Sequence, residues 1–329
     1  MEPTTLIITN SFDMTIDRVI GQLDNETVFR FNRDLWQEYA LSISPEGFRL
    51  VSPTGRTVER FQIAKCYWRV PLSKRALHCN SEPSVTDYIE REIDYVVTEI
   101  VNFLWRDRKV VLVEPKADLR IGKLLQLETG QRYFTIPRYE FRSGFEPSVP
   151  SNLERIVKSM SSTRVTDETY LWTTRVHENN LDPTLPWFVQ DHVDATHDVT
   201  VVYIRGWMEG FSLERRNFQD QTTDWRELAR ITADQWKRHS IPLELKESID
   251  HYMTDLGLHF GRLDFLYDGI MYWFLEVNSN GEWGWLDRKA DGEILDKIVE
   301  EVRPDRPVHP IPVRWKRDSF QGADRVEHQ

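Results

Sequence analysis

Polar side chains interrupt an apolar strand pattern near the C-terminal end of this chain, in the run FLEVN at 274–278. Side chains of a strand alternate between the two faces of a sheet, so Glu276 and Asn278 share one face and their apolar neighbours point to the other. An earlier run, LDF, places Asp264 between two apolar residues in the same way. If the intervening YDGI forms the turn of a hairpin, Asp264 lies opposite or nearly opposite Glu276, and the three polar side chains occupy one surface.

The chemistry that suits these three side chains is the binding of a divalent cation. Two carboxylates held close together repel each other and are costly in a dry core, unless a cation or a shared proton compensates. Oxygen ligands from Asp264, Glu276 and Asn278 suit Mg²⁺, which usually bridges to substrate phosphates. The alternative is an ordinary amphipathic hairpin whose polar face meets solvent.

The elements that position this hairpin follow from the periodicity of the apolar residues. Residues 6–31 read as strand, helix and strand, which indicates a β-α-β unit. After further strand-like runs, the spacing i, i+3, i+4, i+7 predicts an amphipathic helix over 84–105 with Ser84 or Thr86 as its cap. A buried strand, KVVLVEP, ends this first region. The alternation predicts an α/β (α+β) protein.

The second half of the chain is rich in strands. A short helix over 117–130 precedes six strand-like runs, which are YFTIPRYEF, ERIVKSM, YLWTTRV, WFVQDHV, DVTVVYIRG and WMEGFSLERR. A helix follows in which Leu243, Ile249, Tyr252, Met253 and Leu256 share a face, and DRKADGEILDKIVEEV after the hairpin is a closing helix. The Pro and Gly punctuation predicts domains over 1–113, 114–189 and 190–303, and a loosely held tail over 304–329.

Composition excludes several classes of protein. The 329 residues are 40% hydrophobic, enough for a packed core in two or three domains, and the formal net charge of −11 argues against a nucleic-acid binder. No apolar run reaches about 18 residues and the N-terminus lacks the basic flank of a signal peptide, so we expect a cytoplasmic protein without a membrane segment. Cys66 and Cys79 form neither a disulfide framework nor a zinc pattern.

The sequence motifs, taken in their order along the chain, resemble those of a known protein family. The pattern D-F-x(10)-E-V-N, with Asp264, Glu276 and Asn278, resembles the metal-binding signature of the ATP-grasp ligase superfamily. The chain is most similar to the graspetide (microviridin-type) peptide maturases, over roughly residues 4 to 302, with a ribosomal-protein glutamate ligase as a more distant relative. The matching segments, in order, are LIITNSFDMTIDRVI, CYWRVP, LRIGKLLQLETG, IVKSMSS, LWTTRV, VQDHVDATHDVTVVYI, TTDWRELA and NSNGEWGWLD.

The resemblance implies an ATP-grasp fold of three domains, beginning with a Rossmann-like pre-ATP-grasp domain, and it implies ATP and Mg²⁺ as cofactors. Lys123 and Lys158 match the phosphate-binding lysines, and the run SSTRVTDET (161–169) resembles the loop that covers the phosphates, although it has no glycine. Gln190, Asp191 and Val193 match the hinge that meets adenine and ribose.

The chain departs from its relatives after this hinge. Asp198 matches the acid of a D-x-R pattern, but Thr200 stands where relatives have an arginine that stabilises the transferring phosphoryl group or the substrate carboxylate. We expect Arg215 and Arg216 to supply that charge, and Arg226, in the family's DWR element, to add to a basic lining. The alternative is a catalytically weakened protein.

The implied reaction is attack of a carboxylate on the γ-phosphate of ATP, followed by displacement of phosphate by a hydroxyl or amine. In graspetide maturases both groups belong to one ribosomal precursor peptide with a leader and a core, and the product is an ester or amide macrocycle. Two interpretations remain open for four apolar residues of this region. They form an apolar groove for the leader, or they pack in the core; the residues are Trp207, Met208, Phe211 and Trp225.

Three functions therefore remain open. They are a peptide macrocyclase, a ligase that joins a free amino acid or a separate peptide, and a nucleotide- or partner-binding module that has lost turnover. The resemblance also leaves a homodimer open.

Overall fold

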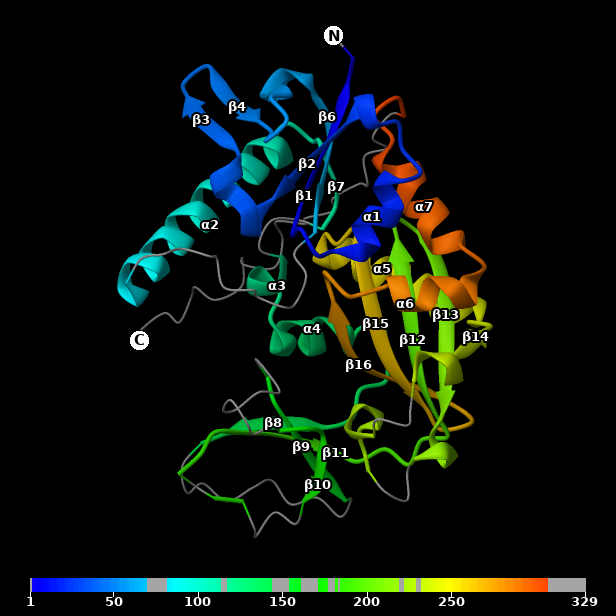
Figure 1. Ribbon diagram of the computed structural model, residues 1–329. Helices are drawn as coiled ribbons and strands as arrows, with labels where there is room; N and C mark the ends of the chain where they lie inside the picture. Colours follow the sequence, from blue (N-terminus) through cyan, green and yellow to red (C-terminus); the bar gives the residue numbers. More distant parts are fainter. Residues whose placement is uncertain are drawn as a thin grey trace, which may run out of the picture.

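The computed structural model describes residues 2–69, 82–113, 117–143, 154–160, 171–176, 181–182, 184–218, 222–228 and 232–306. Within these ranges, no helix has the length and apolar character needed to cross a membrane. The described part is organised around three larger sheets and one small one (Figure 1).

The N-terminal sheet is parallel and has the order β2-β1-β6-β7, which confirms the β-α-β unit. Its elements are β1 (Thr4–Thr9), α1 (Met14–Ile20), β2 (Val28–Asn32), β6 (Ile63–Trp68) and β7 (Val110–Leu112). A side sheet contains β3 (Ala40–Ser44), β4 (Gly47–Val51) and β5 (Thr57–Glu59), of which the sequence did not predict β5. Cys66 is buried, whereas Cys79 lies outside the described residues.

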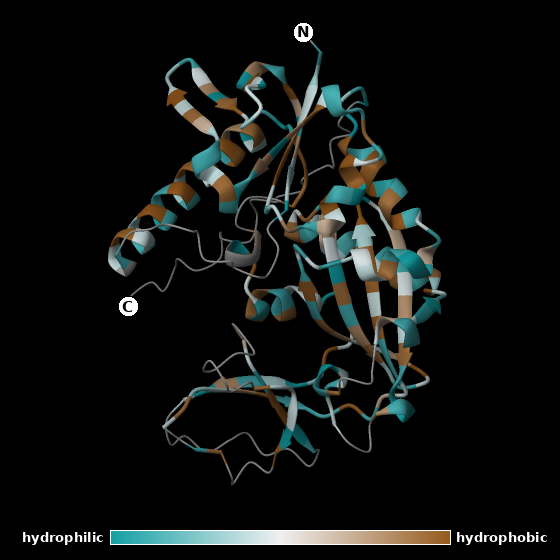
Figure 2. Ribbon diagram, viewed as in Figure 1, coloured by the Kyte–Doolittle hydropathy of each residue, from teal (hydrophilic) through white to brown (hydrophobic). Residues whose placement is uncertain are grey.

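The long helix α2 (Pro83–Arg106) is amphipathic as predicted, and brown and teal segments alternate along it in Figure 2. Its N-cap is Glu82 rather than Ser84 or Thr86, so that prediction was wrong. Pro83 is the cause, because a proline is tolerated in the first turn of a helix and its fixed φ allows the helix to begin there.

The predicted helix over 117–130 is two helices. α3 (Ala117–Arg120) and α4 (Lys123–Gly130) are separated at Gly122, which has an extended backbone with φ −66° and ψ 162° and forms the N-cap of α4. The break directs Lys123, the first residue of α4, toward the site described below.

A second sheet is antiparallel with the order β10-β9-β11-β8 and lies at the bottom of Figure 1. Its strands are β8 (Tyr139–Arg142), β9 (Arg155–Lys158), β10 (Thr174–Val176) and β11 (Trp187–Asp191). The loop predicted to cover phosphates, 161–169, lies outside the described residues.

The third sheet has five antiparallel strands in the order β14-β13-β12-β15-β16. They are β12 (His197–Ile204), β13 (Trp207–Glu214), β14 (Lys237–His239), β15 (Phe260–Tyr267) and β16 (Tyr272–Asn278). Three helices accompany it, α5 (Leu243–Leu256), α6 (Gly284–Asp287) and α7 (Glu293–Val302). Ile249, Tyr252, Met253 and Leu256 of α5 are buried as predicted, but Leu243 at its first residue is 70% exposed.

The two faces of the five-stranded sheet belong to different cores. Val199, Val201 and Tyr203 of β12 pack in one core with α5, whereas Val202 and Ile204 pack in another with α7 and the N-terminal sheet. The second face changes character along β12, because the next residues on it are polar. At that end of the strand, the sheet stops being core and becomes the wall of a cavity.

Candidate active site

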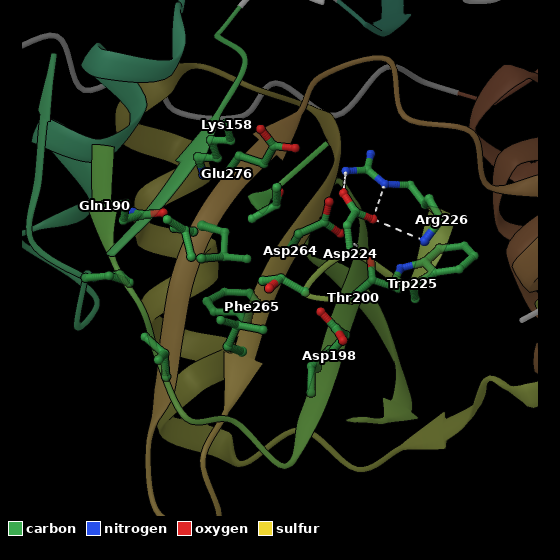
Figure 3. Close-up of a pocket in the computed structure, with 18 of the residues that line it drawn as sticks. Lys158, Gln190, Asp198, Thr200, Asp224, Trp225, Arg226, Asp264, Phe265 and Glu276 are labelled. Atoms are coloured by element: carbon green, nitrogen blue, oxygen red, sulfur yellow. Dashed lines mark hydrogen bonds and ion pairs between the residues drawn. The ribbon is translucent and has the colours of Figure 1, made fainter. Parts of the chain in front are cut away.

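A cavity of about 400 Å³ lies between the β8–β11 sheet and the five-stranded sheet. Nine of the eleven residues predicted for the site line it, namely Lys123, Lys158, Gln190, Asp191, Val193, Asp198, Arg215, Asp264 and Glu276. Asn278 and Arg216 are not among its lining residues. Figure 3 shows Gln190 on one side, Trp225 and Arg226 on the other, and Asp264 between them.

The hairpin has the predicted register. Asp264 pairs with Glu276, and a bulge at the next step places Phe265 opposite Phe274. Asn278 does not line the cavity, but its Nδ2 lies 3.4 Å from Oδ2 of Asp264, so it shares the face of the two carboxylates. These three side chains offer oxygen ligands only, and the described residues hold no group of three or more His, Cys, Asp or Glu that could bind a metal without further ligands. This donor set fits Mg²⁺ shared with a substrate phosphate.

Two lysines surround Glu276. The Nζ of Lys123 lies 3.0 Å from Oε2 of Glu276, and Lys158, at the end of β9, places its Nζ 5.4 Å from the centre of the Phe188 ring. Burial is the largest influence on the pKa of Glu276 and raises it, but Lys123, Lys158 and Arg226 together outweigh burial and lower this pKa to about 2. Glu276 is therefore a carboxylate at neutral pH. Burial lowers the pKa of Lys158, which Glu276 partly opposes.

The position of the family's missing arginine is occupied by a neutral hydrogen bond. Thr200 pairs with Asp264 across β12 and β15, is 2% exposed, and donates its hydroxyl to Oδ1 of Asp264 over 2.7 Å. Thr200 thus orients the carboxylate and supplies no charge.

Positive charge reaches this face from elsewhere. Arg215 is 4% exposed and its Nη1 lies 3.0 Å from Oδ2 of Asp198. Burial raises the pKa of Asp198 to about 6, although Arg215 opposes the shift. Arg216, in contrast, has a side chain that is 78% exposed, pairs with Glu214, and lines a separate surface depression. The structure therefore brings Arg215 to the cavity and leaves Arg216 outside it.

Two further arginines line the cavity, of which Arg262 was not predicted from the sequence. Its Nη2 lies 3.5 Å from Oδ2 of Asp264. The signal was present, because Arg262 stands two residues before Asp264 in the same strand and so shares its face. Arg226 is held by two hydrogen bonds to the Asp224 carboxylate, one of them 2.8 Å from Nε to Oδ1, and its guanidinium lies 5.5 Å from the centre of the Trp172 ring.

The opposite end of the cavity has a different character. Gln190 is 1% exposed, and neither Nε2 nor Oε1 of its amide has a hydrogen-bond partner among the residues that the structure describes. A buried amide without partners is costly, and a bound polar ligand removes that cost. Asp191 pairs with Arg155 over 3.2 Å, and Val193 lines the cavity beside it.

The predicted apolar groove does not form as one surface. Phe211 is fully buried, and Trp207, Met208 and Trp225 are partly buried against two different cores. Trp225 instead packs with Trp236 and Trp285, whose ring centres lie 5.8 and 6.5 Å away, and all three tryptophans line the cavity. Trp236 lies 11 residues after Trp225 and Trp285 lies 60 residues after it, outside any one helix or strand, so periodicity gave no signal for this cluster.

Comparisons with known proteins agree on the fold. No protein-family model and no curated protein sequence matches this chain. A Chryseobacterium gregarium RiPP-associated ATP-grasp ligase in complex with ADP and a leader and core peptide is similar with a TM-score of 0.76 and 18% identity, over 93% of this chain and 98% of that chain. The macrocyclase MdnC from Microcystis aeruginosa, bound with precursor peptide MdnA, has a TM-score of 0.74 and 19% identity over 91% of this chain and 99% of that chain.

A third similar structure is the ATP-grasp ligase PsnB with a phosphomimetic variant of its minimal precursor, Mg and ADP. Its TM-score is 0.67 and its identity 15%, over 92% of this chain and 100% of that chain. The chain therefore has the ATP-grasp fold, in the form found in ligases and macrocyclases of ribosomal peptides.

Proposed function

We propose that this chain is an ATP-dependent ligase that activates Asp or Glu side chains of a ribosomal precursor peptide as acyl phosphates and closes ester or amide macrocycles. One observation carries the proposal. The carboxylates of Asp264 and Glu276 share a cavity wall with the Lys123 and Lys158 ammonium groups, which is the set of charges that phosphoryl transfer requires. The fold supports it, because similar structures contain ADP and leader and core peptides.

ATP is held across the length of the cavity in this proposal. The adenine and ribose lie against Gln190, Asp191 and Val193, where the unpaired amide of Gln190 receives a polar edge of the base. Lys123 and Lys158 bind the phosphates, and Asp264, Glu276 and Asn278 hold Mg²⁺. When bound, Mg²⁺ neutralises charge on the phosphoryl oxygens.

The peptide carboxylate enters from the side of Arg226. Asp224 fixes this guanidinium, and Trp172 lies over it, so Arg226 is oriented before a ligand arrives. Arg262, with Nη2 beside Asp264, is the second charge for this carboxylate and takes the place of the arginine that Thr200 replaces. A planar guanidinium suits a carboxylate because it can donate two parallel hydrogen bonds.

The reaction then needs no protein nucleophile. An oxygen of the substrate carboxylate attacks the γ-phosphorus and ADP leaves; a hydroxyl or amine of the same peptide attacks the acyl carbon, and phosphate leaves. The attacking group loses one proton. The Asp198 carboxylate, with a pKa of about 6, is the acceptor that we assign to this proton.

Hydroxylamine tests the activation step separately from ring closure. A peptide rich in Thr, Asp, Glu and Lys, incubated with the chain, ATP, Mg²⁺ and hydroxylamine, is expected to gain about 15 Da per activated carboxyl, because hydroxylamine captures an acyl phosphate as a hydroxamate. A peptide that remains unmodified while ATP is consumed would argue against carboxyl activation.

The neighbours Arg215 and Arg216 form a matched pair for a second test. Arg215→Met is expected to lower turnover by about 10²-fold, since it removes a charge from the cavity and takes its ion-pair partner from the partly buried Asp198. Arg216→Met is expected to leave turnover within about twofold, because exposed ion pairs contribute little. Initial rates of phosphate release measure both, with the thermal unfolding midpoint recorded for each variant. Equal losses of turnover in the two variants would contradict the assignment of Arg215, and not Arg216, to the active site.

A further inference from the structure

Arg69 ends the strand pairing of β6 and sends a buried side chain toward the loop that follows β16. It is 1% exposed, and its backbone N–H donates to Ile8 of β1. Its Nη1 donates to the carbonyl oxygen of Asn280 over 2.9 Å and to that of Gly281 over 3.4 Å. Its Nη2 donates to the Glu282 carboxylate. One guanidinium therefore holds three consecutive residues of this loop, which a lysine at the same position cannot reproduce because it lacks the planar fork.

The N-terminal segment holds the same loop from another side. Oδ2 of Asp13 lies 3.7 Å from Nε of Arg69, and the hydroxyl of Thr15 donates to Oε1 of Glu282 over 2.8 Å. A Cβ at Gly284 would lie 2.5 Å from Oγ1 of Thr15, so the Thr15 side chain occupies the space that a larger residue at 284 would need. Three of the motifs in the sequence, LIITNSFDMT, CYWRVP and NSNGEWGWLD, thus contribute residues to one cluster around the buried Arg69.

The other side of the loop contacts the cavity. The carbonyl oxygen of Glu282 accepts a hydrogen bond of 3.3 Å from Nη1 of Arg262, and the N–H of Gly281 donates to the carbonyl oxygen of Asn278 over 3.1 Å. A Cβ at Gly281 would lie 2.7 Å from Cβ of Arg262. A displacement of residues 280–282 would therefore move both Arg262 and Asn278, two of the side chains that contact Asp264.

We propose that Arg69 and Glu282 form a latch through which the N-terminal sheet positions the metal-binding and carboxylate-binding side chains of the five-stranded sheet. Arg69 is a positioning residue, because it touches neither the cavity nor any predicted ligand. The inference rests on the proposed function, since it assigns the latch a role in holding Mg²⁺ through Asn278 and Asp264. Outer contacts of this kind typically change metal affinity by about 10- to 100-fold when they are removed.

The variants Arg69→Lys and Glu282→Gln test the latch, and Arg18→Met is the matched control. Arg18 also joins the N-terminal segment to the segment after β16, through an ion pair with fully buried Asp287, but it contacts neither residues 280–282 nor Arg262. Glu282→Gln keeps the size of the side chain and removes only its charge. It tests the latch independently if Arg69→Lys fails to fold.

The measurement is calorimetry of ADP binding with and without Mg²⁺, together with hydrogen exchange of the amides of 278–284. Without Mg²⁺, we expect Arg69→Lys and Glu282→Gln to bind ADP with an affinity within about twofold of wild type. With Mg²⁺, the gain in ADP affinity should be smaller than in wild type by about tenfold or more. Hydrogen exchange of the amides of 278–284 should be faster in both variants. Arg18→Met should keep the full effect of Mg²⁺.

Two results would overturn the latch. One is an undiminished effect of Mg²⁺ on ADP affinity in both latch variants. The other is an equal loss of this effect in Arg18→Met, which would mean that the Arg69–Glu282 contact contributes only to the general stability of the fold. A wild-type chain whose ADP affinity does not respond to Mg²⁺ would instead contradict the proposed metal site. In that case unchanged hydrogen exchange at 278–284 in Arg69→Lys would separately overturn the latch.

Discussion

Replacing Asp264 and Glu276 together by alanine is expected to lower ATP-dependent turnover by about 10³-fold, because the loss of a metal's charge stabilisation amounts to several kcal/mol. The two side chains face each other across β15 and β16 and are the only paired carboxylates that the described hairpin presents to the cavity. Phosphate release in the presence of the peptide measures the effect.

Glu209→Ala provides the control for this double variant. Glu209 lies in β13 of the same sheet and pairs with Arg238 outside the cavity. Its removal should change turnover by less than about twofold, since surface ion pairs contribute little. Retention of more than about a tenth of wild-type turnover in the double variant would contradict a metal role for the pair.

Lys158→Met is expected to lower turnover by about 10²- to 10³-fold, because Lys158 is one of the two lysines among the described residues that line the cavity, and both are proposed to bind the phosphates. The same change should leave the free energy of unfolding unchanged or increase it. Burial lowers the pKa of Lys158, which means that its charge is held at a cost in the folded state, and methionine fills similar space without that cost.

The opposite directions of these two effects make the prediction specific. Turnover is followed by phosphate release and stability by urea unfolding, with Lys237→Met on exposed β14 as the matched control. A variant that loses activity and stability together would indicate that Lys158 is structural.

The shared face of Glu276 and Asn278, which we propose to hold the metal, could be predicted from a local regularity, whereas the pairing of Asp264 with Glu276 depends on a bulge. Strand parity places Glu276 and Asn278 on one face. The turn pairs Tyr267 with Tyr272, a register that would put Leu275 opposite Asp264, and the bulge between Asp264 and Phe265 shifts the pairing to Glu276. The β-α-β unit and α2 follow from apolar spacing in the same way. Helix boundaries were less certain, since a single Pro83 or Gly122 decides them.

The remaining features depend on contacts that no local pattern records. Arg215 and Arg216 are adjacent in sequence, yet the 3₁₀ turn at Arg215–Asn217 sends one into the cavity and the other to solvent. The contact between Trp225 and Trp285 joins residues 60 positions apart, and the Arg69–Glu282 contact spans more than two hundred.

Thr200 is the clearest case of a misleading local comparison. Its lack of charge suggested a weakened protein, but its hydroxyl orients Asp264, and Arg226 and Arg262 bring guanidinium groups to the same cavity. The substitution therefore fits an active ligase in which other strands and loops carry the positive charge.

The central claim, that the chain condenses two side chains of one peptide, is tested most directly by mass spectrometry of a precursor peptide incubated with the chain, ATP and Mg²⁺. The precursor is sought in a short reading frame beside the gene, rich in Thr, Asp, Glu and Lys. The account predicts a loss of about 18 Da per ring with wild type and no loss with the Asp264→Ala, Glu276→Ala variant, because each closure through an acyl intermediate releases one water overall. A gain in mass would instead show that the chain joins a second molecule, and an unchanged mass while ATP is consumed would contradict peptide condensation altogether.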